Sequence, residues 1–356
     1  MVTLVASEEL PGCGTQINFK MKKIGILTSG GDCGGLNAAV RSIFFRAKNT
    51  YGMEVLGIQD GTVGLMQRPV AFLPLDYQTF SGSLLRQGGT FLGTTNKGNP
   101  FKFPMPDGSY KDRTQDIIDG YHELGLEGLI VIGGDGSMSI LTEIAKRGNL
   151  NIVAIPKTID NDVGATESSI GFNTAVSVAT QALDNLIHTA ASHQRSMILE
   201  VMGRDAGHIA LNSGIAIGAQ EILIPEQNMG IEGLINSLKE SKKNGKTSSI
   251  VVVAEGDKTG KNVFDLARQV EEEFPKYEIR VSVLGHMQRG GSPSCFDRVL
   301  ASRLGVKAVE SMIDGENSVM TGLKNNIVML TPFKKAIKGI TKINTELLKV
   351  SDIMSI

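Results

Sequence analysis

Cysteine is scarce in this sequence, which has three among 356 residues, at positions 13, 33 and 295. The number is odd, and the three do not have the spacing of metal ligands. The sequence therefore argues against a disulfide framework or a cysteine metal site, and it indicates a reducing compartment. We expect Cys13, Cys33 and Cys295 to be free thiols.

Long apolar runs and a surplus of one charge are missing as well. No run of about 18 apolar residues occurs, and the N-terminus lacks the basic and apolar regions of a secretory signal. The 36 basic and 37 acidic residues give a formal net charge of -1, so neither a basic surface for nucleic acid nor an acidic tail is indicated. We expect a cytoplasmic protein that has neither a nucleic acid nor a membrane as its partner.

Glycine, in contrast, is abundant, with 42 residues. Pairs of glycines stand where apolar runs end, as at Gly30-Gly31 and Gly133-Gly134. The apolar runs read as strands, and they alternate with segments that have the apolar spacing of helices. This alternation predicts an α/β fold with mainly parallel sheets. At about 150 residues per domain, the length fits two domains.

Two segments have the order strand, glycine-rich loop, helix. In the first, residues 23–28 lead through Ser29-Gly30-Gly31-Asp32 into a helix; in the second, residues 128–132 lead through Gly133-Gly134-Asp135-Gly136-Ser137. Such a loop aims free N–H groups at an anion, so phosphate is the natural ligand. Asp135 is then placed to hold a phosphate-bound Mg²⁺. Tight turns, with Asp135 as a helix cap, are the alternative.

The stretch P-K-T-I-D-N-D, residues 156–162, follows a third predicted strand, residues 152–155. Its hydroxyl, its lysine and its two carboxylates can hold a substrate hydroxyl, accept its proton and anchor a cation. The alternative is a turn, since Pro156 and Asn161 favour one. The carboxyl ends of parallel strands are where α/β sheets bind ligands, and this position favours a catalytic loop.

Polar residues follow predicted strands throughout the chain. Arg195 and Arg204 flank the strand at residues 196–201. Two anion-binding loops, a site for Mg²⁺, arginines and a carboxylate pair together fit phosphoryl transfer between two phosphorylated ligands. The seven residues that follow strand runs are Asp32, Asp135, Asp160, Asp162, Glu255, His286 and Arg289.

Six motifs in this order resemble the 6-phosphofructokinase family: T-S-G-G-D, G-G-D-G-S, P-K-T-I-D-N-D, S-H-Q-R, E-V-M-G-R and G-H-M-Q-R-G-G-S-P. The resemblance runs from about Met21 to Gly322. It implies two Rossmann-like three-layer α/β/α domains with the active site between them. Residues 21–171 plus 288–338 would bind the phosphoryl donor, residues 172–287 plus 339–356 the sugar phosphate, and residues 1–20 would form a flexible extension.

The same resemblance implies that the chain phosphorylates the 1-hydroxyl of fructose 6-phosphate with ATP and Mg²⁺, the committed step of glycolysis. Asp160 would be the base, with Thr158 and Asp162 beside it, Asp135 would hold Mg²⁺ and Arg204 would assist the transferring phosphate. The donor would be lined by Gly31, Asn96, Lys97, Gly134, Asp135, Gly136 and Ser137. The sugar phosphate would be bound by Met202, Gly203, Arg204, Glu255, His286 and Arg289, and by Arg195 and Arg280 of a neighbouring subunit. A homo-oligomer, usually a tetramer, is therefore implied.

Two residues of these motifs point to different phosphoryl donors. Lys157 is typical of pyrophosphate-dependent relatives, whereas Gly136 is the residue of the ATP-dependent ones. A glycine leaves room for the α-phosphate of a nucleotide, and a lysine near phosphates suits either donor. We expect ATP. A pyrophosphate-dependent phosphotransferase is the first alternative, and a non-catalytic subunit that binds sugar phosphate and regulates a paralogue is the second.

Other departures concern contacts around the two substrates. Asn96 stands where the family has an arginine that bridges the two phosphates, with Lys97 next to it, and Ile140 replaces a small residue near the nucleotide. Phe45 and Ile187 fall where the bacterial effector site usually has arginines. We expect altered adenine contacts and altered regulation.

Overall fold

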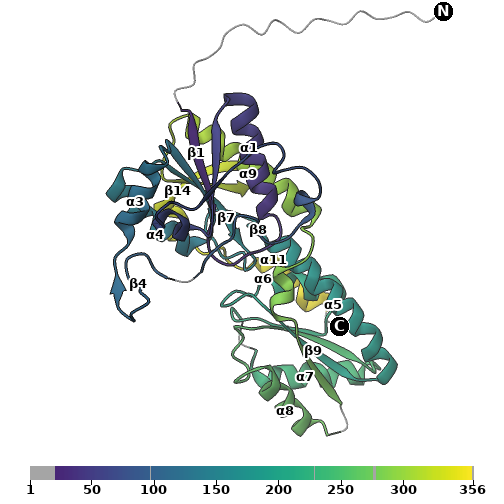
Figure 1. Ribbon diagram of the computed structural model, residues 1–356. Coiled ribbons are helices and arrows are strands. Elements are labelled where there is room, and N and C mark those ends of the chain that lie inside the picture. Colours follow the sequence, from purple (N-terminus) through teal and green to yellow (C-terminus); the bar gives the residue numbers. More distant parts are fainter. Residues whose placement is uncertain (1–20, 97, 228, 276–277, 355–356) are drawn as a thin grey trace, which may run out of the picture.

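The computed structural model describes residues 21–96, 98–227, 229–275 and 278–354. Two sheets, each covered by helices, form an upper and a lower lobe (Figure 1). The predicted N-terminal extension, residues 1–20, lies outside the described residues, as does Lys97. The α/β class with mainly parallel sheets is confirmed.

The first sheet has the strand order β14-β13-β7-β6-β1-β2-β3, and the short β8 pairs with β7. Its inner strands are parallel, and the two outermost strands are antiparallel to their neighbours. The strands are β1 (Lys23–Thr28), β2 (Glu54–Ile58), β3 (Phe72–Pro74), β6 (Gly128–Gly133), β7 (Ile152–Thr158), β8 (Ile170–Gly171), β13 (Val319–Lys324) and β14 (Ile327–Pro332).

Side chains alternate between the two faces of this sheet because successive residues of a strand point to opposite sides. Ile24 and Ile26 belong to the core under α1 (Leu36–Tyr51) and α9 (Cys295–Ile313). Leu27 and Leu129 belong to a separate core on the other face. That face is covered by α2 (Thr62–Met66), α3 (Thr114–Glu123), α4 (Asp135–Gly148) and α10 (Phe333–Ala336).

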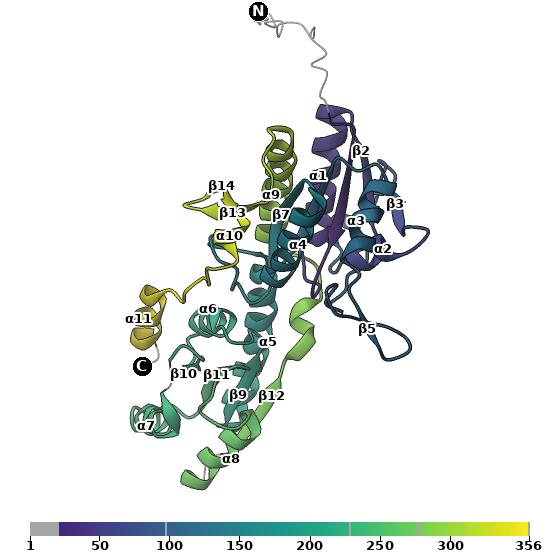
Figure 2. The ribbon, with the colours of Figure 1, turned by 90° about the vertical axis from the view of Figure 1, so that its left-hand side faces the viewer.

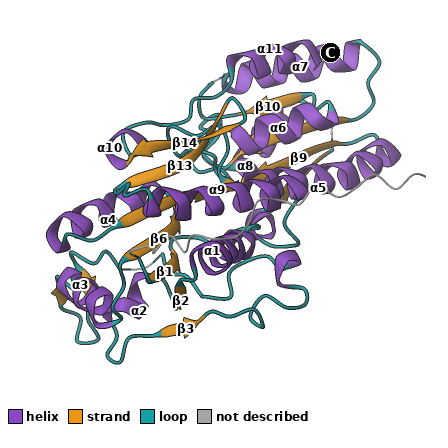
Figure 3. Ribbon diagram, turned by 90° about the horizontal axis from the view of Figure 1, so that it is seen from above, coloured by secondary structure: helices purple, strands orange, loops and turns teal. Residues whose placement is uncertain are grey.

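The second sheet is parallel throughout, in the order β10-β11-β9-β12. One face packs on α5 and α6, and the other packs on α7 and α8, so both sheets have helices on either side (Figure 3). The elements are β9 (Ser196–Val201), β10 (Glu221–Leu223), β11 (Ser249–Ala254), β12 (Ile279–Val283), α5 (Phe172–His193), α6 (His208–Ile217), α7 (Gly230–Lys243) and α8 (Val263–Glu273).

A single core cluster joins the lobes, since it contains Ile26 and Val153 of the first sheet and Leu199 and Val252 of the second. Figure 2 shows α5 running from the junction of the lobes down along the second sheet, with the C-terminal helix α11 (Thr345–Met354) beside α6. The remaining elements are β4 (Phe103–Pro104), β5 (Tyr110–Lys111) and the 3₁₀ helices η1 (Leu84–Arg86) and η2 (Gly285–Arg289). We propose that the lobes are the two domains, with residues 21–171 plus 288–338 in one and residues 172–287 plus 339–356 in the other.

Sequence patterning missed β13 and α6. Helix α6 is apolar on most sides, because both its faces are buried, and it therefore lacks the one-sided pattern of a surface helix. Strand β13 carries Thr321 and Gly322, which interrupt its apolar run. No helix in the described part of the chain is long and apolar enough to cross a membrane. Cys33 and Cys295 are free thiols, as expected, and Cys13 is not among the described residues.

Candidate active site

The parallel strands β1, β6 and β7 are neighbours in the first sheet, so their carboxyl ends bring three loops together. Arg204, which follows β9 of the second sheet, and Arg289 of η2 complete the same pocket. Three of the predicted carboxylates, both glycine-rich loops and two predicted arginines therefore share one cavity, and the predicted Asp32 and Glu255 do not line it. The lining residues are Gly30, Gly31, Gly134, Asp135, Gly136, Ser137, Lys157, Thr158, Asp160, Asp162, Arg204 and Arg289.

Asn161 holds the carboxylate pair in place. It has a φ of 53°, in the left-handed region that asparagine tolerates, and it is 4% exposed. Its side chain donates to the carbonyl of Glu167 at 3.1 Å and accepts from the N–H of Ser169 at 2.9 Å. The chain bends at residues 159–160 after β7, and Asp160 and Asp162 stand on either side of this fixed residue.

Asp160 is 3% exposed, and its Oδ1 atom accepts no hydrogen bond within the described part of the chain. Its N–H donates to Thr158 Oγ1 at 3.1 Å, and its Oδ2 atom lies 3.7 Å from Nε of Arg204. Burial, and then the charge of Asp162, raise the pKa of the Asp160 carboxyl. A carboxylate with one free oxygen and a raised pKa has the properties of a general base.

Lys157 is 4% exposed, and its Nζ atom donates a hydrogen bond to the backbone carbonyl of Gly31. Burial lowers the pKa of its ammonium group. The Lys157 side chain therefore connects the end of β7 to the first glycine-rich loop. It also adds a cationic group to the lining of the pocket.

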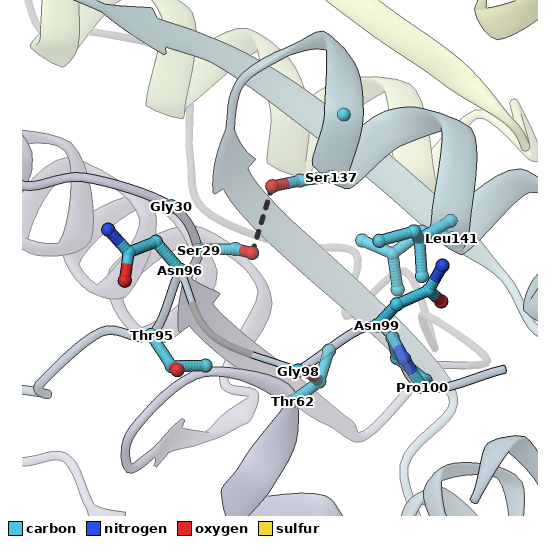
Figure 4. A pocket seen from close by; sticks show the side chains of 12 residues that line it. Ser29, Gly30, Thr62, Thr95, Asn96, Gly98, Asn99, Pro100, Ser137 and Leu141 are labelled. Atoms are coloured by element: carbon cyan, nitrogen blue, oxygen red, sulfur yellow. Dashed lines mark hydrogen bonds between the residues drawn. The ribbon is translucent and has the colours of Figure 1, made fainter. Parts of the chain in front are cut away.

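A second pocket adjoins the first, since Gly30, Gly136 and Ser137 line both. Ser137 Oγ donates to Ser29 Oγ at 2.9 Å and so links the two glycine-rich loops (Figure 4). Asn96 and Ile140 both line this second pocket. The other lining residues are Thr62, Thr95, Gly98, Asn99, Pro100 and Leu141.

Gly136 stands at the opening between the two pockets. A β-carbon added there would meet no atom within 4 Å, so the space beside its Cα is open.

The residues also fit a phosphate-bound Mg²⁺. Asp135 is exposed at the start of α4 and lines the first pocket, with one carboxylate oxygen accepting the N–H of Gly136 at 2.7 Å. No cluster of three metal-ligating side chains exists among the described residues. This donor set suits Mg²⁺, which usually takes one or two protein carboxylates together with substrate phosphates.

The predicted sugar-binding residues are arranged around Glu255. Its Oε1 atom accepts the N–H groups of Gly203 at 3.3 Å and of Arg204 at 2.8 Å. Gln288, which the sequence did not single out, accepts the N–H of Met202 at 3.2 Å. The turn at residues 202–204 is thus held by side chains that arrive from two other loops.

On the opposite wall Arg289 Nη1 donates to the carbonyl of Asp32 at 3.1 Å. This contact connects η2 to the first glycine-rich loop. His286 is exposed on the same short helix and is not among the residues that line the two pockets.

Arg195 and Arg280 do not join the pocket of their own chain. They lie at the amino ends of β9 and β12, whereas the pocket residues follow the carboxyl ends of strands. A strand of six residues is about 20 Å long, which separates the two edges. Glu278 forms ion pairs with both arginines.

Comparison with known proteins agrees with this geometry. A family model described as Phosphofructokinase matches residues 23–312. The chain belongs to the phosphofructokinase family. A protein of Synechocystis sp. named ATP-dependent 6-phosphofructokinase 1 is 52% identical over 335 residues, which cover 90% of this chain and 92% of that protein. The ATP-dependent 6-phosphofructokinase of Natranaerobius thermophilus is 41% identical, over 94% of this chain and all of its own length.

Solved structures share the fold. Phosphofructokinase of Pichia pastoris in the T-state superposes with a TM-score of 0.81 at 30% identity over 98% of this chain, which spans 37% of that longer chain. The Saccharomyces cerevisiae enzyme gives a TM-score of 0.77 at 29% identity, with 48% of its chain covered. A pyrophosphate-dependent phosphofructokinase of Nitrosospira multiformis, at 21% identity and a TM-score of 0.79, shows the fold alone.

Sequence reasoning missed several residues of the site. Gln288 accepts the N–H of Met202, which lies 86 positions earlier in the chain, and Thr95 lines the second pocket. A glutamine or threonine in a loop has no signature of its own. The glycine-rich stretch at residues 88–100 was the available signal, because loops with many glycines often face a ligand.

Proposed function

We propose that this chain transfers a phosphoryl group from ATP to the 1-hydroxyl of fructose 6-phosphate, as the names of its relatives indicate for those proteins. The observation that carries the proposal is the buried Asp160 carboxylate. Asp160 lines a pocket that both glycine-rich loops and two arginines also line, and its Oδ1 atom accepts no hydrogen bond within the described part of the chain. Such an arrangement places a base between two anion sites.

In this proposal Asp160 accepts the proton of the attacking hydroxyl. Thr158 and Asp162 line the pocket beside it and orient the sugar. Arg204, whose guanidinium is 3.7 Å from Asp160 and mostly exposed, is free to stabilise charge on the transferring phosphoryl group. Arg289 and His286, from η2, bind the 6-phosphate, and Glu255 with the turn at residues 202–204 holds the sugar.

The loop at residues 134–137 binds the donor phosphates through N–H groups at the start of α4, and Gly30 and Gly31 of the first loop line the same pocket. When bound, Mg²⁺ neutralises charge on the donor phosphates. Asp135 supplies a carboxylate oxygen for it from the edge of the pocket. Gly136 lines both pockets and has open space where a β-carbon would be, so ATP extends past it into the second pocket.

The proposal includes a homo-oligomer, with a tetramer as the expected form. The chain's own pocket lacks Arg195 and Arg280, and both arginines are held by Glu278 at a surface away from it. A neighbouring copy can supply them. The free thiols of Cys33 and Cys295 fit a cytoplasmic location.

A coupled assay that detects fructose 1,6-bisphosphate tests the proposal. Purified protein, fructose 6-phosphate and Mg²⁺ are incubated with ATP or with pyrophosphate. Turnover with ATP is expected, and turnover with pyrophosphate alone contradicts the choice of donor. Binding of fructose 6-phosphate by calorimetry without turnover on either donor would instead indicate the regulatory subunit.

A further inference from the structure

Helices α5 and α9 begin next to each other, and Asp297 lies between their first turns. Ser294 is the N-cap of α9, and Asp297 is the third residue of that helix. This spacing is that of a capping box, in which the serine accepts the N–H of the acidic residue and the acidic residue accepts the N–H of the serine. The structure contains the first of these bonds, from Asp297 N–H to Ser294 Oγ at 3.2 Å.

In place of the second bond of the capping box, the Asp297 carboxylate and the Ser294 N–H each bond to residues at the start of α5. The carboxylate of Asp297 accepts the N–H of Gly171 at 3.1 Å, the N–H of Thr174 at 2.7 Å and the hydroxyl of Thr174 at 2.5 Å. In return, Thr174 Oγ1 accepts the N–H of Ser294 at 3.0 Å. The third residue of each helix therefore caps the other helix.

Gly171 explains why α5 needs a cap from elsewhere. It is the N-cap of α5, with a φ of 101°, and a β-carbon there would overlap the side chain of Cys33. Only glycine fits, and glycine has no side chain with which to accept the first N–H groups of the helix. Asp297 supplies the missing acceptor.

Asp297 is fully buried, and burial raises the pKa of its carboxyl, although its hydrogen bonds act in the opposite direction. Within the described residues no lysine or arginine forms an ion pair with it. Its charge is balanced by N–H and hydroxyl donors at two helix N-termini, where the helix dipoles also favour an anion. Separating the N-termini of α5 and α9 would remove donors that stabilise the buried charge of Asp297. The two helix ends are therefore held together tightly.

Each of these helices directly follows a loop of the candidate active site. The segment that follows Asp160 and Asp162 leads into α5. The segment that follows His286 and Arg289 leads into α9. We propose that Asp297 is a positioning residue for phosphoryl transfer: by capping both helices it fixes the base loop relative to the loop that binds the sugar phosphate. This inference rests on the proposed function, because the roles of Asp160 and Arg289 belong to that proposal.

Three variants test it. Asp297→Asn replaces an acceptor oxygen with an amide donor, Thr174→Val removes the bridging hydroxyl at nearly constant volume, and Ser42→Ala is the control. Ser42 is a buried residue of α1 whose hydroxyl donates to the carbonyls of Ala39 and Ala301, so the control loosens the contact of α9 with another helix. Ser42 bonds to α9 four residues beyond Asp297, and neither of its two hydrogen bonds involves Asp297, Thr174 or Ser294.

Steady-state kinetics give the first readout. Since hydrogen bonds to a charged group are lost, kcat/KM for fructose 6-phosphate should fall about tenfold in Asp297→Asn and in Thr174→Val. The double variant should be no worse than the worse single variant, because both changes break the same exchange. Thr174→Ser keeps the hydroxyl and should restore the value. Ser42→Ala should lower Tm and leave kcat/KM unchanged.

Hydrogen exchange gives a readout that does not need turnover. Amides of residues 159–171 and 285–294 should exchange faster in Asp297→Asn than in the unaltered protein, and they should not do so in Ser42→Ala. Turnover of the unaltered protein with ATP decides the proposed function separately. The inference is overturned if Asp297→Asn lowers Tm while kinetics and exchange in both segments stay unchanged, or if the effects of the two single variants simply add. If Asp297→Asn does not fold, the same comparison is made between Thr174→Val and Thr174→Ser.

Discussion

The buried ammonium of Lys157 donates a hydrogen bond to the backbone carbonyl of Gly31, and this contact joins the end of β7 to the first glycine-rich loop. Replacing Lys157 by methionine keeps the length of the side chain and removes both the bond and the charge. We expect the KM for ATP to rise and kcat to fall, together by about tenfold or more, because a donor to charged phosphates is lost as well.

The control for this variant is Lys146→Met, which removes a lysine from an exposed position near the end of α4. Steady-state kinetics with varied ATP should show no change for the control. Unaltered ATP kinetics in Lys157→Met would mean that the ammonium serves only to join the two loops.

Asp160→Asn should lower kcat by about 10² or more, since a general base contributes 10² to 10⁴ in rate. The effect of this substitution on stability should have the opposite sign to its effect on kcat. Because the folded pKa of Asp160 is raised above its unfolded value, its contribution to stability is fully present below pH 3.8 and is lost as pH rises through the folded pKa. At neutral pH the asparagine variant should therefore unfold at the same or a higher temperature.

Kinetics and thermal unfolding at pH 7 check both parts of this prediction. Asp184→Asn, on an exposed face of α5, is the matched control and should change neither quantity. Retained turnover in Asp160→Asn would remove the role of base from that residue.

The pH dependence of kcat/KM for fructose 6-phosphate should reflect the raised pKa of Asp160. A base must be deprotonated to act, so activity should be lost as pH falls through a value above the usual 3.8 of an aspartate. The charge of Asp162 raises the pKa of Asp160, although burial raises it more. In Asp162→Asn the acidic limb of the profile should move to lower pH, whatever happens to the maximum rate. A limb that moves upward would exclude Asp160 as the titrating group.

Gly136→Asp should abolish the use of ATP. The new carboxylate would enter the free space between the two pockets and repel the nucleotide phosphates. Folding should be preserved or improved, because an acidic residue in the first turn of a helix is favourable. Calorimetric titration with ATP and thermal unfolding measure the two effects, and Gly136→Ala is the control for the added β-carbon. Unchanged ATP affinity in the aspartate variant would place the nucleotide elsewhere.

Most of the fold was predictable because its signals are local. The runs at residues 23–28, 128–132 and 152–155 are strands, and the polar residues after them lie at one edge of the sheet. The antiparallel pairing of β14 with β13 was not predicted, since β13 itself was missed. Thr95 and Asn99, which line the second pocket, come from a stretch that has few regular elements and therefore no periodicity to read.

The sequence by itself determined where most strands and helices begin and end to within a few residues, because apolar periodicity and glycine-rich loops act over a few neighbouring residues. Only the tertiary structure decided which of these ends meet. The S-x-x-D spacing of Ser294 and Asp297 predicts a cap within one helix, yet the carboxylate caps α5 instead, because Gly171 has no acceptor of its own and α5 begins within reach. A free N–H group takes the nearest oxygen in space, and which oxygen is nearest depends on how the helices pack.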